Sequence, residues 1–272
     1  MRAVSLHRDV IVVTSVLLQV NCVIVRGGVG EGAEGADGEV FVIDSPVLPD
    51  ELDALPALLE QAHFAGPAGL LATHGDWDHV LGSLAFPGVP LGCAESTAER
   101  LQGSPGEAQR ALRSFDEELA IERPRPLALG AVQALPVPGR CEIGDAELEL
   151  HPADGHTLDG MAISIPWART LVLGDYLSPV EIPTLDDPNA IDAYLATLER
   201  LRPLLARTEH VVPGHGAVIG SARALSILEE DVGYLAALRL SGADAELPAG
   251  RRSRQQRRLH AENVSQLCRS GQ

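Results

Sequence analysis

Residues 73–79 are Thr-His-Gly-Asp-Trp-Asp-His, and this run decides how the rest of the chain is interpreted. It brings two histidines and two aspartates close together in the sequence: His74, Asp76, Asp78 and His79. The apolar stretch 69–72 before it is typical of a buried strand, and a helix-like stretch follows. Imidazole and carboxylate groups are the usual ligands of divalent metals. The run therefore predicts a metal site, with a polar loop that caps a helix as the alternative.

Three later segments each add one ligand-type residue beside glycine. Residues 155–160 are Gly-His-Thr-Leu-Asp-Gly, which puts His156 in a turn between expected strands. One apolar strand-like stretch ends on Gly-Asp at Asp175, and another ends on Pro-Gly-His-Gly around His215. Small neighbours at strand edges and turns let a metal ion approach. These residues strengthen the prediction of a metal site.

The ordered set His-x-x-x-Asp-His, Gly-His-Thr, Gly-Asp and Pro-Gly-His-Gly resembles the metallo-β-lactamase superfamily over roughly residues 10–240. The resemblance implies an α/β fold, a four-layer αβ/βα sandwich with the metals at one edge of two sheets. It also implies that Asp44 is a structural residue that supports the metal loop. Finally, it implies seven ligands: His74, Asp76 and His156 at a first metal, Asp78, His79 and His215 at a second, and Asp175 as the bridge.

Asp76 departs from the family pattern, because most hydrolases of the family have histidine there. Aspartate is shorter, so direct ligation after a small loop shift and ligation through a water are both open. Its charge lowers the net charge of two ions, two aspartates and a bridging hydroxide from about +1 to about zero. We therefore expect a weaker Lewis acid. Zinc is the first expectation, and the harder ligand set also suits manganese or iron.

The resemblance implies a metal-dependent hydrolase with a dinuclear centre. Two metals lower the pKa of a shared water toward about 7, and the bridging hydroxide attacks a carbonyl or phosphoryl centre. Asp78 is also a candidate catalytic residue that orients the nucleophile or relays a proton. Small esters, thioesters and lactones rank first as substrates, because the sequence has no extra domain of the kind found in RNA-processing branches.

Three alternatives stay open at this point. A carboxylate at position 76 also occurs in diiron oxygen-handling or redox proteins of the superfamily, although these usually carry a flavin domain. It occurs as well in a nuclease-like module that accompanies membrane spans, which keeps a phosphodiesterase or nuclease-type activity in view. The third is a binding protein with a decayed site, which the presence of all seven ligand-type side chains disfavours.

The composition of the chain limits the classes of partner that we expect. The chain has 272 residues and a formal net charge of −17. This acidity argues against a nucleic-acid partner and fits a small-molecule substrate. The apolar stretch 10–25 is too short to span a bilayer as a helix, so we expect no membrane contact. Four cysteines without a C-x-x-C pair favour free, buried thiols and a cytoplasmic location.

Periodicity predicts a single domain with a tail. A hairpin is expected at 10–16 and 20–26, followed by a glycine-rich loop at 27–38. Further strands are expected at 39–43, 131–137, 146–150, 161–165, 170–173 and 210–212, and helices at 49–63, 96–119, 189–206 and 221–240. We place a metallo-β-lactamase-like domain at 1–245 and an arginine-rich tail at 246–272. Part of a substrate pocket is expected within 96–119.

The tail carries five arginines, at 251, 252, 254, 257 and 258. One interpretation is a polyanion-binding patch. Pairing with the acidic body of this subunit, or of a neighbour in a homo-oligomer, is favoured because charge runs are usually solvated or locally paired. No motif maps to the tail, so we expect it to be dispensable for metal binding. Trp77 and Tyr176 are candidates for the substrate entrance, with loop packing as the alternative.

Overall fold

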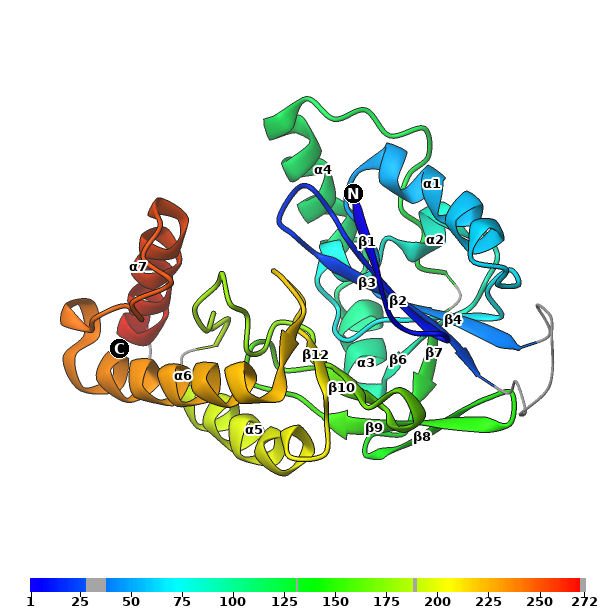
Figure 1. Ribbon diagram of the computed structural model, residues 1–272. Helices are drawn as coiled ribbons and strands as arrows, with labels where there is room; N and C mark the ends of the chain where they lie inside the picture. The colour runs from blue at the N-terminus through cyan, green and yellow to red at the C-terminus, as the bar shows by residue number, and fades with distance from the viewer. Residues whose placement is uncertain (28–37, 131, 188–189, 270–272) are drawn as a thin grey trace.

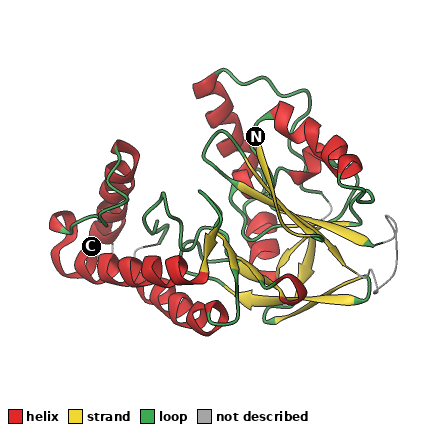
Figure 2. Cartoon of the chain, viewed as in Figure 1, coloured by secondary structure: helices red, strands yellow, loops and turns green. Residues whose placement is uncertain are grey.

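The computed structural model describes residues 1–27, 38–130, 132–187 and 190–269. Its strands form two sheets that pack face to face, and helices cover the outer face of each sheet (Figures 1 and 2). The expected α/β fold, a four-layer sandwich, is therefore confirmed. The glycine-rich loop expected at 27–38 lies almost entirely outside the described residues, as do the first residues of the expected elements at 131 and 189.

The first sheet, as far as the chain is described, has seven strands in the order of the sequence. They are β1 (Arg2–His7), β2 (Val10–Thr14), β3 (Asn21–Gly27), β4 (Glu39–Ile43), β5 (Gly69–Leu71), β6 (Leu91–Ala94) and β7 (Val132–Leu135). Strands β1 to β4 are antiparallel, and β4 to β7 are parallel. The carboxyl ends of β4 and β5 therefore meet at one edge, where Asp44 and the run 73–79 follow.

The second sheet has six strands in the described chain, in the order β13-β12-β11-β10-β9-β8. They are β8 (Gly139–Ile143), β9 (Ala146–Pro152), β10 (Met161–Ile165), β11 (Thr170–Val172), β12 (His210–Val212) and β13 (Ile219–Gly220). Only β11 and β12 are a parallel pair among these strands. Their carboxyl ends lie side by side, and Asp175 and His215 follow them.

Helices fill the two outer layers. The first sheet is covered by α1 (Pro49–Gln61), α2 (Gly82–Ala85), α3 (Glu95–Gly103) and α4 (Glu107–Leu119). The second is covered by α5 (Ala190–Leu205) and α6 (Ser221–Ser241). Figure 1 shows α7 (Arg254–Arg269) above the C-terminal end of α6, and the connection between the two begins with a short 3-10 helix, Gly242–Asp244. No helix in the described ranges is long and apolar enough to cross a membrane.

Strand alternation separates the core into three apolar layers. Val23 and Val25 of β3 face the second sheet, whereas Ile24 between them packs against the helices of the first. In β11, Leu171 faces α5 and α6, and Val172 faces the first sheet. Successive side chains of a strand point to opposite faces, so strands buried on both sides are continuously apolar. This burial fixes the strand register and, with it, the strand ends that carry polar residues.

Several sequence expectations needed correction. The strands β1, β6, β8 and β13 were not anticipated, and the expected helix at 96–119 divides into α3 and α4 around Ser104. Cysteines were expected to be buried, and Cys22 and Cys93 are, but Cys141 is half-buried and Cys268 is exposed. All four are free thiols. The proposed boundary at residue 245 stays a prediction.

The tail makes buried contacts with the body. Arg251 is only 1% exposed, and its Nη1 and Nη2 lie 2.5 Å from Asp231 Oδ1 and 3.1 Å from Glu230 Oε2. The exposed Arg252 and Arg258 pair instead within the tail, with Glu246 and Glu262. The favoured interpretation, in which the tail pairs with the acidic body of the same subunit, therefore holds for Arg251. Its burial is difficult to reconcile with the expectation that the tail is dispensable.

Replacement of Arg251 by methionine should lower the free energy of unfolding by about 3–5 kcal/mol, because Asp231 would be left buried without its cation. Urea denaturation measures this. The matched control is Arg252→Met, whose side chain is 52% exposed and should change stability by less than about 0.5 kcal/mol. Equal stability of the two variants would show that the Arg251 pair does not hold the tail to the body.

Candidate metal centre

Asp44 anchors the loop that carries the first group of candidate ligands. It follows β4 with a φ of +56°, a conformation that few non-glycine residues adopt. Its carboxylate accepts hydrogen bonds from the amide and hydroxyl of Thr73, at 2.8 and 2.9 Å. It also lies 2.9 Å from His79 Nδ1, which directs Nε2 of that ring toward the centre. Asp44 is therefore a positioning residue, as the sequence predicted.

The four histidines of the motifs share one arrangement. Each Nδ1 has a neighbour in the protein: Thr73 Oγ1 at 3.1 Å for His74, Asp44 for His79, the Thr184 carbonyl at 3.3 Å for His156 and the Leu18 carbonyl at 2.9 Å for His215. The buried Nε2 atoms of His74, His79 and His156 have no hydrogen-bond partner. Four rings with engaged Nδ1 atoms and converging Nε2 atoms match the donor set of a transition-metal site.

Asp175 lies between two groups of side chains. Its Oδ1 is 3.1 Å from His79 Nε2 and 3.3 Å from His215 Nε2. Its Oδ2 is 3.3 Å from His156 Nε2 and 3.9 Å from His74 Nε2. Each oxygen thus faces a different pair of histidines, which is the arrangement that a carboxylate bridging two ions requires.

One further aspartate completes each group. Asp76 Oδ2 lies 3.5 Å from His74 Nε2 and 3.4 Å from His156 Nε2. Asp78 Oδ2 lies 3.5 Å from His215 Nε2 and 3.9 Å from His79 Nε2. Ligand atoms of a tetrahedral ion at about 2.0 Å are separated by little more than 3 Å, so these spacings suit two metal ions. All seven residues predicted from the sequence lie in these two groups and their bridge.

The charges of the cluster also favour cations. Burial alone would lower the pKa of His215, but the charges of Asp175 and Glu181 raise it to about 10. Burial likewise opposes protonation of His156, whose pKa is raised to about 9 by its hydrogen bond with Asp76 and the charge of Asp175. The histidines therefore sit in a negative potential, which divalent ions would neutralise.

The glycines of the motifs allow this close approach. A Cβ atom at Gly214 would collide with Asp175 Oδ1, so the loop before His215 can pass the bridge only with glycine there. The Asn21 side chain of β3 donates hydrogen bonds to the Pro213 and Gly216 carbonyls, both at 2.8 Å. The first sheet thus holds the His215 loop of the second sheet against the centre.

Comparison with known proteins agrees with this geometry. The family model of the metallo-beta-lactamase superfamily matches residues 16–215. The chain belongs to this superfamily. Comparison with curated proteins finds no match.

Solved structures with the same fold are distant in sequence. The stereoselective inverting sec-alkylsulfatase Pisa1 from Pseudomonas sp. superposes with a TM-score of 0.70 at 15% identity, over 98% of this chain and 50% of that protein. A metallo-beta-lactamase family protein from Thermus thermophilus gives 0.66 at 19% identity, over 98% and 95% of the two chains. A beta-lactamase domain protein from Burkholderia ambifaria gives 0.66 at 16%, over 97% and 87%. This superfamily member thus spans half the length of the alkylsulfatase and shares the fold with all three.

Arg100 of α3 is a site residue that sequence reasoning missed. Its Nη2 lies 2.8 Å from Asp76 Oδ1, and its Nη1 lies 2.9 Å from Asp159 Oδ1. The other oxygen of Asp159 accepts a hydrogen bond from the Gly75 amide at 2.9 Å, inside the metal loop. Arg100 occurs in a helix without any recognisable motif, so the sequence held no signal for it.

The contact with Arg100 changes the interpretation of Asp76. Arg100 binds Oδ1 of Asp76, whereas Oδ2 faces His74 and His156. The free oxygen of the carboxylate is therefore turned toward the same point as the two imidazoles. The guanidinium also offsets part of the extra negative charge that the sequence analysis placed at the centre. The net charge of the centre therefore differs less than expected from that of a superfamily site with histidine at this position.

Glu181 is a second residue that the motifs did not reveal. Its carboxylate forms a group with Asp175 and His215 in which the candidate ligand atoms lie within 4.8 Å of one another. The side chain is 17% exposed, and Oε2 lies 4.0 Å from His215 Nδ1. Glu181 belongs to the loop after β11, six residues beyond Asp175. It adds a carboxylate to the side of the centre formed by His215.

The aromatic residues next to the ligands pack in loops. Tyr176 is 2% exposed, its hydroxyl donates to the Asp154 carbonyl at 2.7 Å, and it accepts from the His156 amide at 2.9 Å. The expectation that it lines the substrate entrance is therefore wrong; it supports His156 from behind. The Trp77 ring stacks on Phe115 of α4 at 4.5 Å between centroids.

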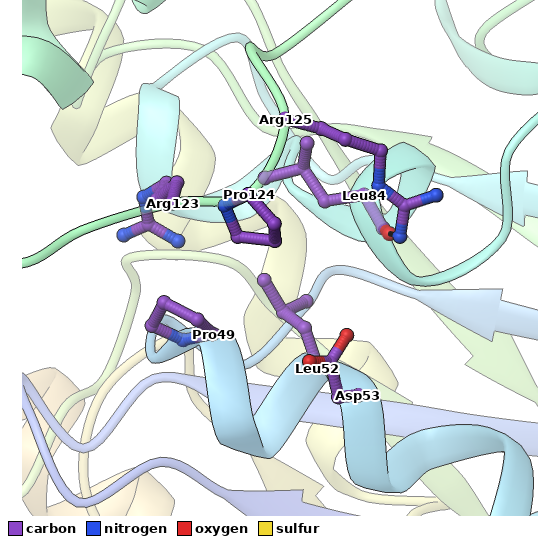
Figure 3. Close-up of a pocket in the computed structure, with 7 residues that line it drawn as sticks. All are labelled: Pro49, Leu52, Asp53, Leu84, Arg123, Pro124 and Arg125. Atoms are coloured by element: carbon purple, nitrogen blue, oxygen red, sulfur yellow. Dashed lines mark hydrogen bonds between the residues drawn. The ribbon is translucent and has the colours of Figure 1, made fainter.

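The cavities around residues 96–126 do not border the ligands. A small cavity lies between α1 and the segment after α4 (Figure 3), where Arg125 donates to the Leu84 carbonyl at 2.9 Å. A larger one of about 550 Å³ lies between α4 and residues 120–127. Neither is lined by a candidate metal ligand. Arg100 is the residue through which this region reaches the centre.

Replacement of Arg100 by glutamine should weaken metal binding at the first group about 10- to 100-fold, because Asp76 would lose the partner that orients it. Competition with a chromophoric chelator measures the two affinities separately. Arg110→Gln, in the exposed part of α4, is the matched control and should bind metal like the unmodified protein. If both variants bind equally well, Arg100 does not position Asp76.

Proposed function

We propose that this protein is a metal-dependent hydrolase with a dinuclear centre that cleaves an ester, thioester, lactone or related bond of a small molecule. The observation that carries the proposal is the position of Asp175, whose two oxygens face separate pairs of histidines. Membership of a superfamily that typically consists of metal-dependent hydrolases supports it. The formal net charge of −17 supports a small molecule over a nucleic acid as the partner.

The proposed ligands divide as the resemblance implies. They are His74, Asp76 and His156 for one ion, Asp78, His79 and His215 for the other, and Asp175 as the bridge. Two bound divalent ions would supply an acidified shared water and would polarise the substrate oxygen. Zinc is the first expectation. The two groups offer carboxylate and imidazole but no thiolate, which is also compatible with manganese or iron.

Asp78 is the proposed catalytic residue of the protein itself. Its contacts with His79 and His215 both use Oδ2. Oδ1 is then the oxygen that can orient the nucleophile or pass a proton to the leaving group. The buried position of Asp78, beside the bridge, would hold the carboxylate in one orientation throughout the reaction.

The second candidate is a diiron redox or oxygen-binding protein of the same fold. Asp76 is the observation that favours it, since a third carboxylate at the ions makes the ligand set harder. The two candidates predict different spectra and different metals. A ligand-to-metal absorption band of iron–oxygen species would favour the second candidate, and a colourless zinc protein with hydrolytic activity the first.

Metal removal should abolish hydrolysis. Elemental analysis should find about two ions per chain, and dialysis against a chelator should remove them together with activity toward a panel of esters, thioesters and lactones. The metal-loaded protein should also melt at a higher temperature, because ligands that bind only the folded state stabilise it. A fully active protein after complete removal of metal would contradict the proposal.

Asp76→His should keep the fold and shift the metal preference toward zinc, because a neutral nitrogen ligand replaces a carboxylate at the same position of the loop. Asp76→Ala should instead weaken the first group, which would retain His74, His156 and the bridge. The zinc-to-manganese affinity ratio of the three proteins measures the effect. If the ratio and the stoichiometry are the same in all three, Asp76 is not a ligand.

A further inference from the structure

A cavity of about 370 Å³ is lined by Glu181, the carboxylate that forms a candidate ligand group with Asp175 and His215. Its walls come from three parts of the chain: the turn between β2 and β3, the loop after β11 and the start of the tail. Leu18 of the turn lines the cavity and accepts the hydrogen bond of His215 Nδ1 through its carbonyl. Glu181 of the loop lines it and also belongs to a candidate ligand group. Glu181 is therefore a wall of the cavity that also approaches the centre.

The tail holds this wall in place. The Ile182 amide donates to Gln256 Oε1 at 2.7 Å, and the Leu185 amide donates to Asn263 Oδ1 at 3.0 Å. Arg251 Nη1 donates to the Glu181 carbonyl at 2.8 Å. The backbone of the loop that carries Glu181 is thus fixed by side chains of the tail. The carbonyl of Thr184, in the same loop, lies 3.3 Å from His156 Nδ1. The tail therefore also supports a candidate ligand.

Glu181 gives the cavity its charge. In the described part of the chain, the other charged residue that lines it is Arg251, whose terminal nitrogens are paired with Asp231 and Glu230. Among the described residues, no lysine or arginine forms an ion pair with Glu181, whose Oε2 lies 4.0 Å from His215 Nδ1. Its Oε1 accepts a hydrogen bond from the side-chain amide of Gln255 at 3.4 Å. The remaining lining residues are apolar or neutral, including Val180 and Gln256.

Glu181 is largely buried and lies 4.0 Å from the His215 imidazole, with no lysine or arginine paired to it among the described residues, so a cationic ligand would lower the cost of its burial. The metal ions would not repel such a ligand strongly, because the carboxylates of Asp76, Asp78 and Asp175 offset most of their charge. The acidic surface would draw cations toward the site.

We propose that this cavity binds a cationic group of the substrate, an alkylammonium, and that Glu181 is the residue that selects it. The inference rests on the proposed hydrolase function, since it describes the substrate of the same centre. Apolar and amide walls around one carboxylate suit an ammonium that carries alkyl groups. The reacting bond would then lie on the other side of Glu181, toward Asp175 and His215.

A pair of isosteric probes tests the charge selection without requiring turnover. Choline and 3,3-dimethylbutan-1-ol have the same shape, and only choline is charged. Calorimetry on the zinc-loaded protein should show choline binding roughly tenfold more tightly, and Glu181→Gln should bring the two affinities close to equality. Glu246→Gln is the matched control, because this tail glutamate is 92% exposed and should leave the ratio unchanged.

The corresponding thioesters separate the two proposals. The unmodified enzyme should prefer acetylthiocholine to the 3,3-dimethylbutyl thioacetate in kcat/KM, and Glu181→Gln should lose this preference while it still cleaves the neutral thioester. Equal affinities of the two probes in the unmodified protein would overturn the cation site, even if the neutral thioester is hydrolysed. Charge selection without any hydrolysis would overturn the hydrolase alone. Loss of a metal ion from Glu181→Gln would overturn the selective role, because Glu181 would then be a ligand.

Discussion

The burial of carboxylate side chains at the ends of the sheets is the constraint on which the rest of this structure depends. Asp76, Asp78, Asp175 and Glu181 approach one another in a largely buried space, and burial of unpaired carboxylates is unfavourable. His156 and His215 hold raised pKa values for that reason. Two metal ions would relieve most of this charge. Arg100 offsets part of it at Asp76, and the proposed alkylammonium group would offset part of it at Glu181.

The fold brings these groups together through two pairs of parallel strands. The pair β4 and β5 delivers Asp44 and the run 73–79 to one edge, and the pair β11 and β12 delivers Asp175 and His215. Polar residues that follow parallel strands gather at a common edge, whereas the apolar strands themselves stay in the core. Hydrogen bonds from Asn21 across the two sheets then fix the distance between the halves of the centre.

Hydrogen bonds also connect the tail to the centre. Its side chains satisfy backbone amides of the loop after β11, and that loop supports His156 and presents Glu181. Buried backbone groups need hydrogen-bond partners, and here these come from a helix more than seventy residues further along the chain, as the separation of 74 between Ile182 and Gln256 shows. Residues that no motif marks can therefore shape both metal binding and substrate choice.

The sequence alone determined the fold family and the candidate ligands, because both depend on short local patterns of residues. Seven ligand-type residues stand in short motifs beside glycine, and apolar strands precede most of them. Only the tertiary structure decided the roles of Arg100, Glu181 and Arg251. Arg100 meets Asp76 across 24 residues, and Arg251 meets the Glu181 carbonyl across 70. Such contacts follow from the packing of helices against loops, which leaves no periodic or motif signal in the sequence. The position of Tyr176, buried against the His156 backbone, was decided in the same way.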